Sequence, residues 1–505
     1  MKPCTDKELS EIVKSLPKKS SAGPDGITTR DVQEIFDIIK GLLLRQINNT
    51  LKSGNFPKLC KISKVIPIYK KGKKEDPSNY RPIAITSIFA KILEKVIKDR
   101  LTNFFKLSAK QYGFQTKSST LGATTDLIEY IIQKLEQKEI VITLFIDLQK
   151  AFDTINIKIL LIKLKKLGID GNSYKLLHSF LNDRKQYVQL NATTSKKIKT
   201  TSGVPQGTVL GPLLYMIYVE SIAKIGLQCT YWMFADDTAL VFHHKNAQEL
   251  LQIIKTDIEK FLDWLDINHL VINSKKTVFM EFKQKKKQKS ALNITINNVQ
   301  LKEVENYNYL GLNIDKKLTW DNHIENIVNK LSGLVGALRK LSPYINEKCR
   351  KMIYFSHITS ALTYLMPIWS NTSQYNLNRL QRLQNKAIKS IHNLDNYTPT
   401  QEVFKIVPYM TIKQLKFHEC SKLIYKIHNN FLKSNTKLKE RFKIHNRILR
   451  NSNTLSTNKV KTNRGRRSPV YSATQCYNNL PQRITSNRDI KKFLKELQQY
   501  TYKNI

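Results

Sequence analysis

Cysteine is scarce in this sequence of 505 residues, which contains six cysteines and no Cys-x-x-Cys pair. So sparse a set excludes a disulfide framework, and we expect reduced thiols with structural roles. His418 and Cys420 lie close together, but no further ligands follow at the spacing of a zinc site. We therefore interpret both as ordinary helix residues.

Long apolar runs are also missing. No uninterrupted stretch reaches the roughly 20 residues that a transmembrane helix needs, and Met1-Lys2-Pro3-Cys4 does not begin a signal peptide. We therefore expect an intracellular protein, in the nucleus and cytoplasm, with no membrane partner.

Acidic residues are few, with 40 Asp and Glu against 84 Lys and Arg, so the formal net charge is +44. The isoelectric point is near 9.9. Such an excess is best explained by an extended polyanionic partner, and nucleic acid is favoured over the alternative, an anionic membrane surface. A hydrophobic content of 41% fits a folded chain, and the length allows two to four domains.

The most informative motif is a pair of adjacent acids between two short apolar runs. Thr230 to Met233 and Thr238 to Phe242 have strand-like compositions, and Phe234-Ala235-Asp236-Asp237 lies between them, which predicts a β-hairpin. Two like charges at a hairpin tip are unfavourable, because tight turns prefer Asn-Gly or Asp-Gly. An isolated acid pair would be interpreted as a solvated surface turn. A broken local rule in this context indicates a functional site.

A divalent metal ion would explain the acid pair, since Mg²⁺ takes carboxylate oxygens and its charge removes their repulsion. Asp147 ends an apolar run that starts at Val141, and a strand there would bring it to the sheet edge that carries Asp236. Two ions roughly 3.5–4 Å apart would clamp the attacking and leaving oxygens of a phosphoryl transfer. Two roles remain open for Asp153: with Thr154 it precedes a helical pattern, so an N-cap is at least as reasonable as a metal contact.

Two other segments have residues suited to a phosphorylated substrate. Lys64 and Arg81 lie in strand-like runs, and a guanidinium matches phosphate oxygens, although a solvated charged face is the alternative. The loop 201–212 is rich in glycine and proline, so its backbone can approach a ligand and Gln206 can hydrogen-bond a base or sugar. By itself such a loop is weak evidence, because most are simply turns.

The C-terminal part has a different pattern. From about Trp320 onward the apolar spacing is helical, which predicts a predominantly α-helical region. Residues 431–505 carry 18 Lys and Arg against 3 Asp and Glu, including the cluster Arg464-Gly465-Arg466-Arg467. We expect this basic tail to contact phosphates without sequence preference and to become ordered in part only on binding.

In order and spacing, these motifs resemble the reverse transcriptases of non-LTR (LINE-type) retrotransposons, most like the Jockey-related branch. The motifs are Arg81-Pro82-Ile83, Phe145-Ile146-Asp147 with Ala151-Phe152-Asp153, Gly203-Val204-Pro205-Gln206-Gly207, Phe234-Ala235-Asp236-Asp237, Asn273 with Lys276-Thr277, and Tyr309-Leu310-Gly311-Leu312. The resemblance is strong over residues 20–312 and weaker through the helical region to residue 481.

The resemblance implies an α+β right-hand polymerase, with fingers, a palm built on an antiparallel sheet and a thumb, followed by a mainly α-helical basic C-terminal region. It divides the chain into an N-terminal extension with fingers (1–135), a palm with fingers insertions (136–315), a helical thumb (316–400) and the C-terminal region with its tail (401–505).

The implied activity is that of an RNA-directed DNA polymerase, whose partners are an RNA template, a DNA primer or target, and dNTPs. Its cofactor would be two Mg²⁺ ions, for which Mn²⁺ can substitute. Asp147, Asp236 and Asp237 would bind the metals, and Lys276 would protonate the leaving pyrophosphate unless it is a simple surface lysine. The dNTP would contact Lys64, Arg81, Gln206 and Phe152, whose ring would exclude a ribonucleotide 2′-hydroxyl; template and primer would contact Gly207, Tyr309, Leu310 and Gly311.

The sequence also departs from complete elements of this type, which usually carry an endonuclease ahead of the polymerase. No nuclease residues and no C-terminal cysteine-histidine knuckle can be assigned. We expect a polymerase fragment, a truncated copy or an incomplete gene model, with a separate or missing endonuclease. Two alternatives stay open: a non-catalytic nucleic-acid-binding protein, which the intact acids disfavour, and an intron maturase, which the Jockey-like motifs and the long helical tail disfavour.

Overall fold

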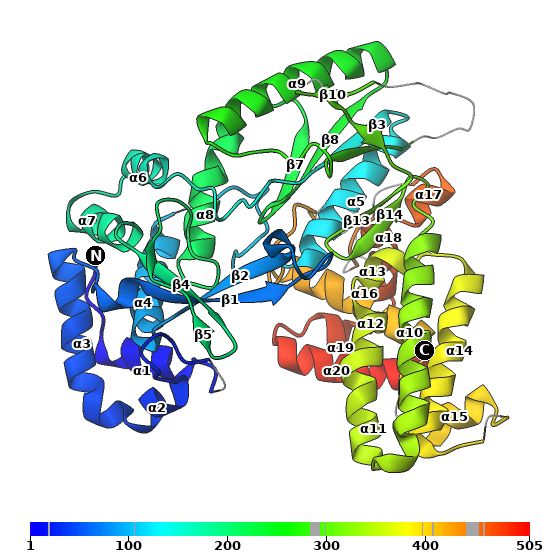
Figure 1. Ribbon diagram of the computed structural model, residues 1–505. Helices are drawn as coiled ribbons and strands as arrows, with labels where there is room; N and C mark the ends of the chain where they lie inside the picture. The colour runs from blue at the N-terminus through cyan, green and yellow to red at the C-terminus, as the bar shows by residue number, and fades with distance from the viewer. Residues whose placement is uncertain are drawn as a thin grey trace. The chain divides into compact units, whose positions relative to one another are not determined.

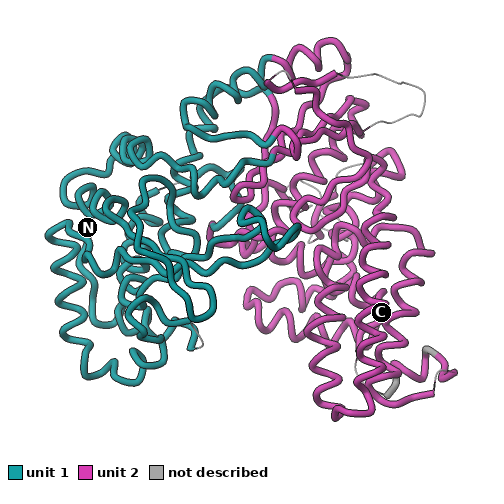
Figure 2. The backbone as a smooth tube through the Cα atoms, in the orientation of Figure 1, with its two compact units in different colours: residues 1–114, 147–228, 256–273 teal, residues 115–146, 229–255, 274–505 magenta. Residues whose placement is uncertain are grey.

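The computed structural model describes residues 1–18, 21–105, 107–282, 293–297, 299–395, 397–406, 409–440, 454–457 and 460–505. These divide into two compact units (Figure 2). Unit 1 comprises residues 1–114, 147–228 and 256–273, and unit 2 comprises residues 115–146, 229–255 and 274–505. One long helix, α9 (Ala247–Ile267), contributes residues to both. None of the described helices is both long and apolar enough to span a bilayer.

Unit 1 combines helices with a mixed sheet (Figure 1). The strand order is β2-β1-β4-β5, with β6 also paired to β4; β1 is antiparallel to β2 and parallel to β4. The strands are β1 (Ile62–Tyr69), β2 (Tyr80–Thr86), β4 (Lys185–Leu190), β5 (Thr193–Thr194) and β6 (Ile198–Lys199). The helices are α1 (Asp6–Lys14), α2 (Thr29–Glu34), α3 (Phe36–Ser53), α4 (Ile88–Phe104), α6 (Ile157–Lys166), α7 (Gly171–Leu181) and α8 (Gly211–Val219).

Helix α8 anchors the glycine-proline loop that precedes it. Pro212 lies in the first turn of the helix, where a missing backbone N–H is tolerated. All the remaining residues of the helix are buried. A helix that is apolar on all sides belongs inside a core. The end of loop 201–212 is therefore fixed in the interior of unit 1.

Unit 2 contains an antiparallel core of strands in the order β12-β9-β3-β8-β7. The central strand β3 (Ile140–Ile146) is antiparallel to both neighbours, β8 (Asp237–His244) and β9 (Val278–Phe282). All residues of β3 after Ile140 are buried, as expected of a strand that is apolar except for Thr143 and is covered on both faces. The edge strands are β7 (Thr230–Phe234) and β12 (Lys302–Glu303), and helix α5 (Thr120–Glu136) packs against β3 and β7. The predicted strand before Asp147 is thus confirmed.

The rest of unit 2 is mainly helical, as predicted from Trp320 onward. Two small hairpins precede it, β10 (Thr295–Ile296) with β11 (Val299–Gln300) and β13 (Asn306–Tyr309) with β14 (Leu312–Asp315). The helices are α10 (Asp321–Leu341), α11 (Glu347–Ile353), a π-helix (Tyr354–Thr359), α12 (Ser360–Thr363), α13 (Met366–Trp369), α14 (Gln374–His392), α15 (Thr400–Ile406), α16 (Ile412–His428), α17 (Asn463–Arg466), α18 (Pro469–Asn478), α19 (Gln482–Thr485) and α20 (Ile490–Asn504). The chain is therefore an α+β protein.

The described part of the basic C-terminal segment is folded and mainly helical, and the expectation that part of the tail becomes ordered only on binding stays a prediction. An apolar core joins α16, α18 and α20, and in it the rings of Tyr425 and Phe493 stack with centroids 3.6 Å apart. The excess of lysine and arginine in the sequence did not reveal this core, because its apolar residues lie among the lysines along the chain. Residues 441–453, which contain part of the predicted tail, lie outside the described residues.

Three carboxylates on α5 hold this C-terminal segment in unit 2. Asp126 accepts the backbone N–H of Asn435 at 2.6 Å, and Glu136 accepts that of Lys461 at 2.9 Å. Glu129 accepts the hydroxyl of Ser468 at 2.5 Å. Each carboxylate satisfies polar groups of a loop that lies about 300 residues away in the chain. The C-terminal segment is thereby attached to the helix that covers β3.

Candidate functional site

The predicted hairpin is present, and its turn exposes both acids. β7 and β8 pair as far as Phe234 opposite Asp237, so Ala235 and Asp236 form the turn. Ala235 has a φ of 57°, in the left-handed region, where a non-glycine residue is strained by about 1 kcal/mol. Asp236 and Asp237 are exposed. Local strain beside two repelling carboxylates is typical of a ligand-binding turn.

A buried tyrosine lies beside Asp237. Tyr309 is 2% exposed, and its ring centroid lies 5.7 Å from that of Phe145 on β3. Burial, and after it the charge of Asp237, raises the pKa of the Tyr309 hydroxyl well above its usual range. Tyr309 therefore packs against the central strand and supports the acid turn from inside unit 2.

The turn after Tyr309 has the geometry that its sequence requires. Leu310 and Gly311 have φ values of 51° and 82°, as a two-residue turn of type I′ demands. The hydroxyl of Tyr364 donates to the carbonyl of Leu310 at 2.7 Å, and a Cβ on residue 311 would lie 3.0 Å from the Tyr364 ring. Gly311 is the exposed residue of this turn, whereas Tyr309 is not.

Asp147 directly follows the central strand. Ile146, the last residue of β3, pairs with Thr238 of β8, and Asp147 is the next residue of the chain, where unit 1 resumes. Asp147 is half-buried, and its carbonyl accepts the N–H of Asn273 at 2.8 Å. This bond fixes the path of the backbone as it leaves the strand. Lys276, in unit 2, is exposed and lies shortly before β9.

Phe152 is held in place by an aromatic contact and a backbone hydrogen bond. Its ring stacks on Tyr215 of α8 with centroids 4.5 Å apart, and Phe114 meets it edge-on at 6.2 Å. The N–H of Val204 donates to the carbonyl of Phe152 at 2.9 Å. The ring is therefore fixed against loop 201–212 within unit 1.

Asp153 binds Gln206 and is not an N-cap, so the prediction of a capping role is wrong. Both carboxylate oxygens of Asp153 accept from Nε2 of Gln206 at 3.3 Å. Burial raises the pKa of the Asp153 carboxyl, and the hydrogen bond from Gln206 opposes that shift. Helix α6 is capped by Asn156, whose side chain accepts the N–H groups of the first turn. Sequence spacing could not separate three polar residues that all precede the same helix.

The Gln206-Gly207 segment is pinned to the edge strand of the unit 1 sheet. The N–H of Ala84 on β2 donates to the carbonyl of Gln206 at 2.6 Å. Gly207 has a φ of 112°, and a Cβ there would lie 2.5 Å from the Ala84 carbonyl oxygen. Only glycine fits both restrictions. The side chain of Gln206 is consequently displayed from a rigid backbone.

Glu94 holds the other end of this loop, and sequence reasoning missed it. Its side chain on α4 is fully buried, and Oε2 accepts the N–H groups of Val209 at 2.7 Å and Leu210 at 3.0 Å. Burial raises the pKa of this carboxyl, and the two backbone hydrogen bonds oppose the rise. A glutamate on the apolar face of a helix, four residues after Ala90 and three before Ile97, was the available signal.

The two predicted phosphate ligands of unit 1 lie on one face of the β1–β2 pair. Lys64 is paired with Ile85, and Arg81 with Ile68. Because side chains alternate along a strand and paired residues share a face, Lys64 and Arg81 project to the same side. Lys64 and Ile68, the residue paired with Arg81, are four residues apart on β1, or roughly 13 Å at the rise of a strand, a span that long side chains can close.

The donor chemistry of the acid turn fits a hard divalent cation. Within the described residues, no three His, Cys, Asp or Glu side chains are arranged to hold a metal ion. The turn itself supplies two exposed carboxylates, Asp236 and Asp237, which are the oxygen donors that Mg²⁺ prefers. A bound cation would remove the electrostatic repulsion between the two carboxylates.

Comparisons with known proteins show what the chain is similar to. Residues 68–314 match the family described as reverse transcriptase (RNA-dependent DNA polymerase). The probable RNA-directed DNA polymerase from transposon BS of Drosophila melanogaster is 29% identical, and the RNA-directed DNA polymerase from mobile element jockey of the same species is 28% identical. Each alignment covers 79% of this chain and 45% of the relative, so the chain spans about half the length of these relatives.

A more distant likeness is to telomerase from Candida Tropicalis in complex with a fragment of telomeric RNA. It has a TM-score of 0.41 and 13% identity, and covers 95% of this chain and 68% of that one. The predicted resemblance to non-LTR reverse transcriptases and the α+β polymerase fold class are confirmed by the family match, the two relatives and the mixed sheets.

Proposed function

We propose that the chain, whose residues 68–314 match the reverse transcriptase family, is an RNA-directed DNA polymerase of a non-LTR retrotransposon. It extends a DNA 3′-hydroxyl on an RNA template with dNTPs, by two-metal nucleotidyl transfer. The observation that carries the proposal is the antiparallel pairing of β3 with β8, Ile146 opposite Thr238, at the sheet end that bears the acid turn.

Three carboxylates would hold the cofactor: Asp147, Asp236 and Asp237. When bound, Mg²⁺ would lower the pKa of the attacking hydroxyl and neutralise charge on the transferred phosphoryl group, and Mn²⁺ could take its place. The primer 3′-hydroxyl would lose its proton to solvent as its oxygen bonds to the α-phosphorus of the dNTP. The bond from this phosphorus to the α,β-bridging oxygen would break and release pyrophosphate. Lys276 would donate the proton that the leaving pyrophosphate takes up.

Side chains of unit 1 would select the incoming nucleotide. Arg81 and Lys64, which share one face of the β1–β2 pair, would neutralise the triphosphate. Phe152 would exclude a 2′-hydroxyl by steric contact, and its fixed stacking on Tyr215 supports this role because a mobile ring could yield. Gln206 and Gly207 would position the template and the new base pair.

In unit 2, the turn that follows Tyr309 would support the primer end. Leu310 and Gly311 present backbone there, and Gly311 is exposed. The strained φ of Ala235 supports the metal-binding role of the acid turn, since strain of this kind persists where function requires it.

Primer extension tests the proposal. The full chain is incubated with an oligo(dT) primer on a poly(rA) template, dTTP and Mg²⁺, beside the variants Asp236→Asn and Asp263→Asn. Asp263 is an exposed residue of α9, and its substitution makes the same change of charge at a residue that is not part of the turn. We expect extension by the wild type and by Asp263→Asn, and a loss of at least about a hundredfold in Asp236→Asn, because a neutral amide is a poor ligand for Mg²⁺.

A measurement of primer-template binding distinguishes a loss of catalysis from a loss of folding. It also distinguishes a polymerase from a protein that only binds nucleic acid. Asp236→Asn should bind the labelled duplex as the wild type does, since the exposed acid makes no contribution to the core. Extension that survives in Asp236→Asn contradicts the metal site. A wild-type chain that binds the duplex but never extends it would favour the non-catalytic alternative.

A further inference from the structure

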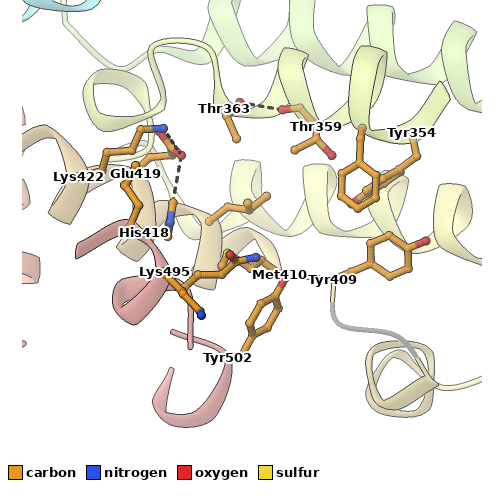
Figure 3. Close-up of a pocket in the computed structure, with 14 residues that line it drawn as sticks. Tyr354, Thr359, Thr363, Tyr409, Met410, His418, Glu419, Lys422, Lys495 and Tyr502 are labelled. Carbon is orange, nitrogen blue, oxygen red and sulfur yellow. Dashed lines mark hydrogen bonds and ion pairs between the residues drawn. The ribbon is translucent and has the colours of Figure 1, made fainter. Parts of the chain in front are cut away.

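A cavity of about 490 Å³ lies in the helical part of unit 2 (Figure 3). Its walls are the π-helix and α12, the segment at Tyr409 and Met410, and two helices of the C-terminal region, α16 and α20. None of the residues predicted for the polymerase site lines it. A volume in this range suits one small ligand or one nucleotide unit and is too small for a duplex.

One side of the cavity is aromatic. Tyr354 and Phe355 come from the π-helix, a rare helix type that is frequent at functional sites. The rings of Phe355 and Tyr409 stack with centroids 5.7 Å apart, and Phe355 is 54% exposed. Tyr502 of α20 also lines the cavity. A half-exposed ring backed by a second ring offers a flat face on which another planar group can stack.

The facing side is basic. Lys422 of α16 and Lys495 of α20 line the cavity, and Lys495 is exposed. The one carboxylate among the lining residues, Glu419, is bound by Lys422 at 3.0 Å and by His418 at 3.1 Å, so its charge is compensated locally. Helices α16 and α20 each contain four lysines and one glutamate. The cavity therefore combines stacking surface with an excess of positive charge, which is the chemistry of sites for single-stranded nucleic acid.

We propose that this cavity binds one unpaired nucleotide of a single-stranded nucleic acid, outside the polymerase site. The base stacks on Phe355, and the adjoining phosphate is held by Lys495. Only an unpaired base can present its face in this way, because in a duplex both faces are occupied by neighbouring bases. This inference rests on the proposed function only in the choice of RNA as the first ligand.

Fluorescence anisotropy tests the site with the full chain and without dNTPs or metal. The probes are labelled oligo(U) RNA and oligo(dT) of equal length, titrated at several salt concentrations. Phe355→Ala removes the stacking face, and its control Met352→Ala removes a side chain that is 65% exposed on α11 and does not line the cavity. Lys495→Gln removes a lining charge, and its control Lys491→Gln removes an exposed charge on the same helix.

The expected results differ between the two variants. Phe355→Ala should weaken binding by at least about fivefold, the lower end of measured base-stacking contributions, and should leave the salt dependence unchanged. Lys495→Gln should reduce the slope of log K against log salt by about 0.7, the value for one phosphate contact on a single strand. Both controls should bind within about twofold of the wild type. Equal effects on RNA and DNA indicate a strand of either kind, whereas a preference for RNA indicates recognition of the 2′-hydroxyl.

A second measurement locates the contact. Photo-crosslinking of 4-thiouridine oligonucleotides, followed by peptide mapping, should yield adducts at lining residues such as Phe355 or Tyr502. Wild-type affinity in both variants, equal losses in the controls, or adducts confined to residues 68–314 would overturn the inference. The failure of the two proposals is distinguishable: a chain that binds strands through this cavity but does not extend primers contradicts only the proposed polymerase activity.

Discussion

The sharpest structural prediction concerns Glu94, which fixes the loop that carries Gln206 and Gly207. Its buried Oε2 atom accepts two backbone N–H groups, from Val209 and Leu210. Glu94→Ala would leave both donors without an acceptor in the interior, and each such donor costs about 1–3 kcal/mol. The free energy of unfolding should therefore fall by roughly 2–6 kcal/mol. The cavity left by the missing side chain should lower it further.

Glu94→Gln should be much milder. The amide oxygen can still accept from the loop, and the substitution removes a negative charge whose burial raises the pKa of the carboxyl. We expect the free energy of unfolding of Glu94→Gln to lie within about 1 kcal/mol of that of the wild type. Glu259→Ala, an exposed glutamate on α9, serves as the control for losing a carboxylate and should change stability by less than about 0.5 kcal/mol.

Urea unfolding measures these stabilities, and single-nucleotide incorporation measures the consequence for activity. In the folded fraction of Glu94→Ala, a displaced loop should raise KM for dTTP more than it lowers kcat, because Gln206 loses its position while the acid turn of unit 2 is unchanged. Glu94→Gln should restore KM to within about twofold. Wild-type stability together with wild-type KM in Glu94→Ala would refute the anchoring role.

Three further outcomes test individual residues. Phe152→Ala should relax discrimination against ribonucleotides by at least about tenfold, measured as the ratio of kcat/KM for dTTP and UTP, and an unchanged ratio removes the gate role. Ala235→Gly should raise Tm, because glycine relieves a left-handed strain of about 1 kcal/mol, without raising primer extension; a lower Tm contradicts the strain. His323, whose burial lowers its pKa to about 4, stays neutral while the unfolded chain takes up a proton below about pH 6.5. The His323 contribution should therefore lower the free energy of unfolding by about 2 kcal/mol between pH 7 and pH 5, and urea unfolding of His323→Asn should lack that contribution.

The acid turn and the strand before Asp147 were predictable because both signals are local. Short apolar runs on either side of the acids define β7 and β8, and a largely apolar run defines β3. The helical pattern after Trp320 is equally local, and it yields α10 and α14 where expected. By contrast, the role of Asp153 depended on which distant side chain reached it. Gln206, 53 residues further along, did so, and Asn156 took the cap.

The C-terminal region illustrates the same limit. Its excess of lysine and arginine is visible in composition, and that excess predicts contact with phosphates. Composition did not reveal that Asp126, Glu129 and Glu136 of α5 would accept hydrogen bonds from loops about 300 residues away. Nor did it reveal that the helices would enclose an aromatic and basic cavity.

The sequence by itself determined the element types, the charge and the order of the motifs, because periodicity and turn chemistry depend on residues within a few positions of one another. Only the tertiary structure decided that Glu94 holds the Gln206 loop, that Tyr309 is buried beside Asp237 and that Phe355 stays half-exposed over Tyr409. The apolar face of a helix or strand can pack against many other elements. The free energy of packing and hydrogen bonding across the whole fold selects which of them it contacts.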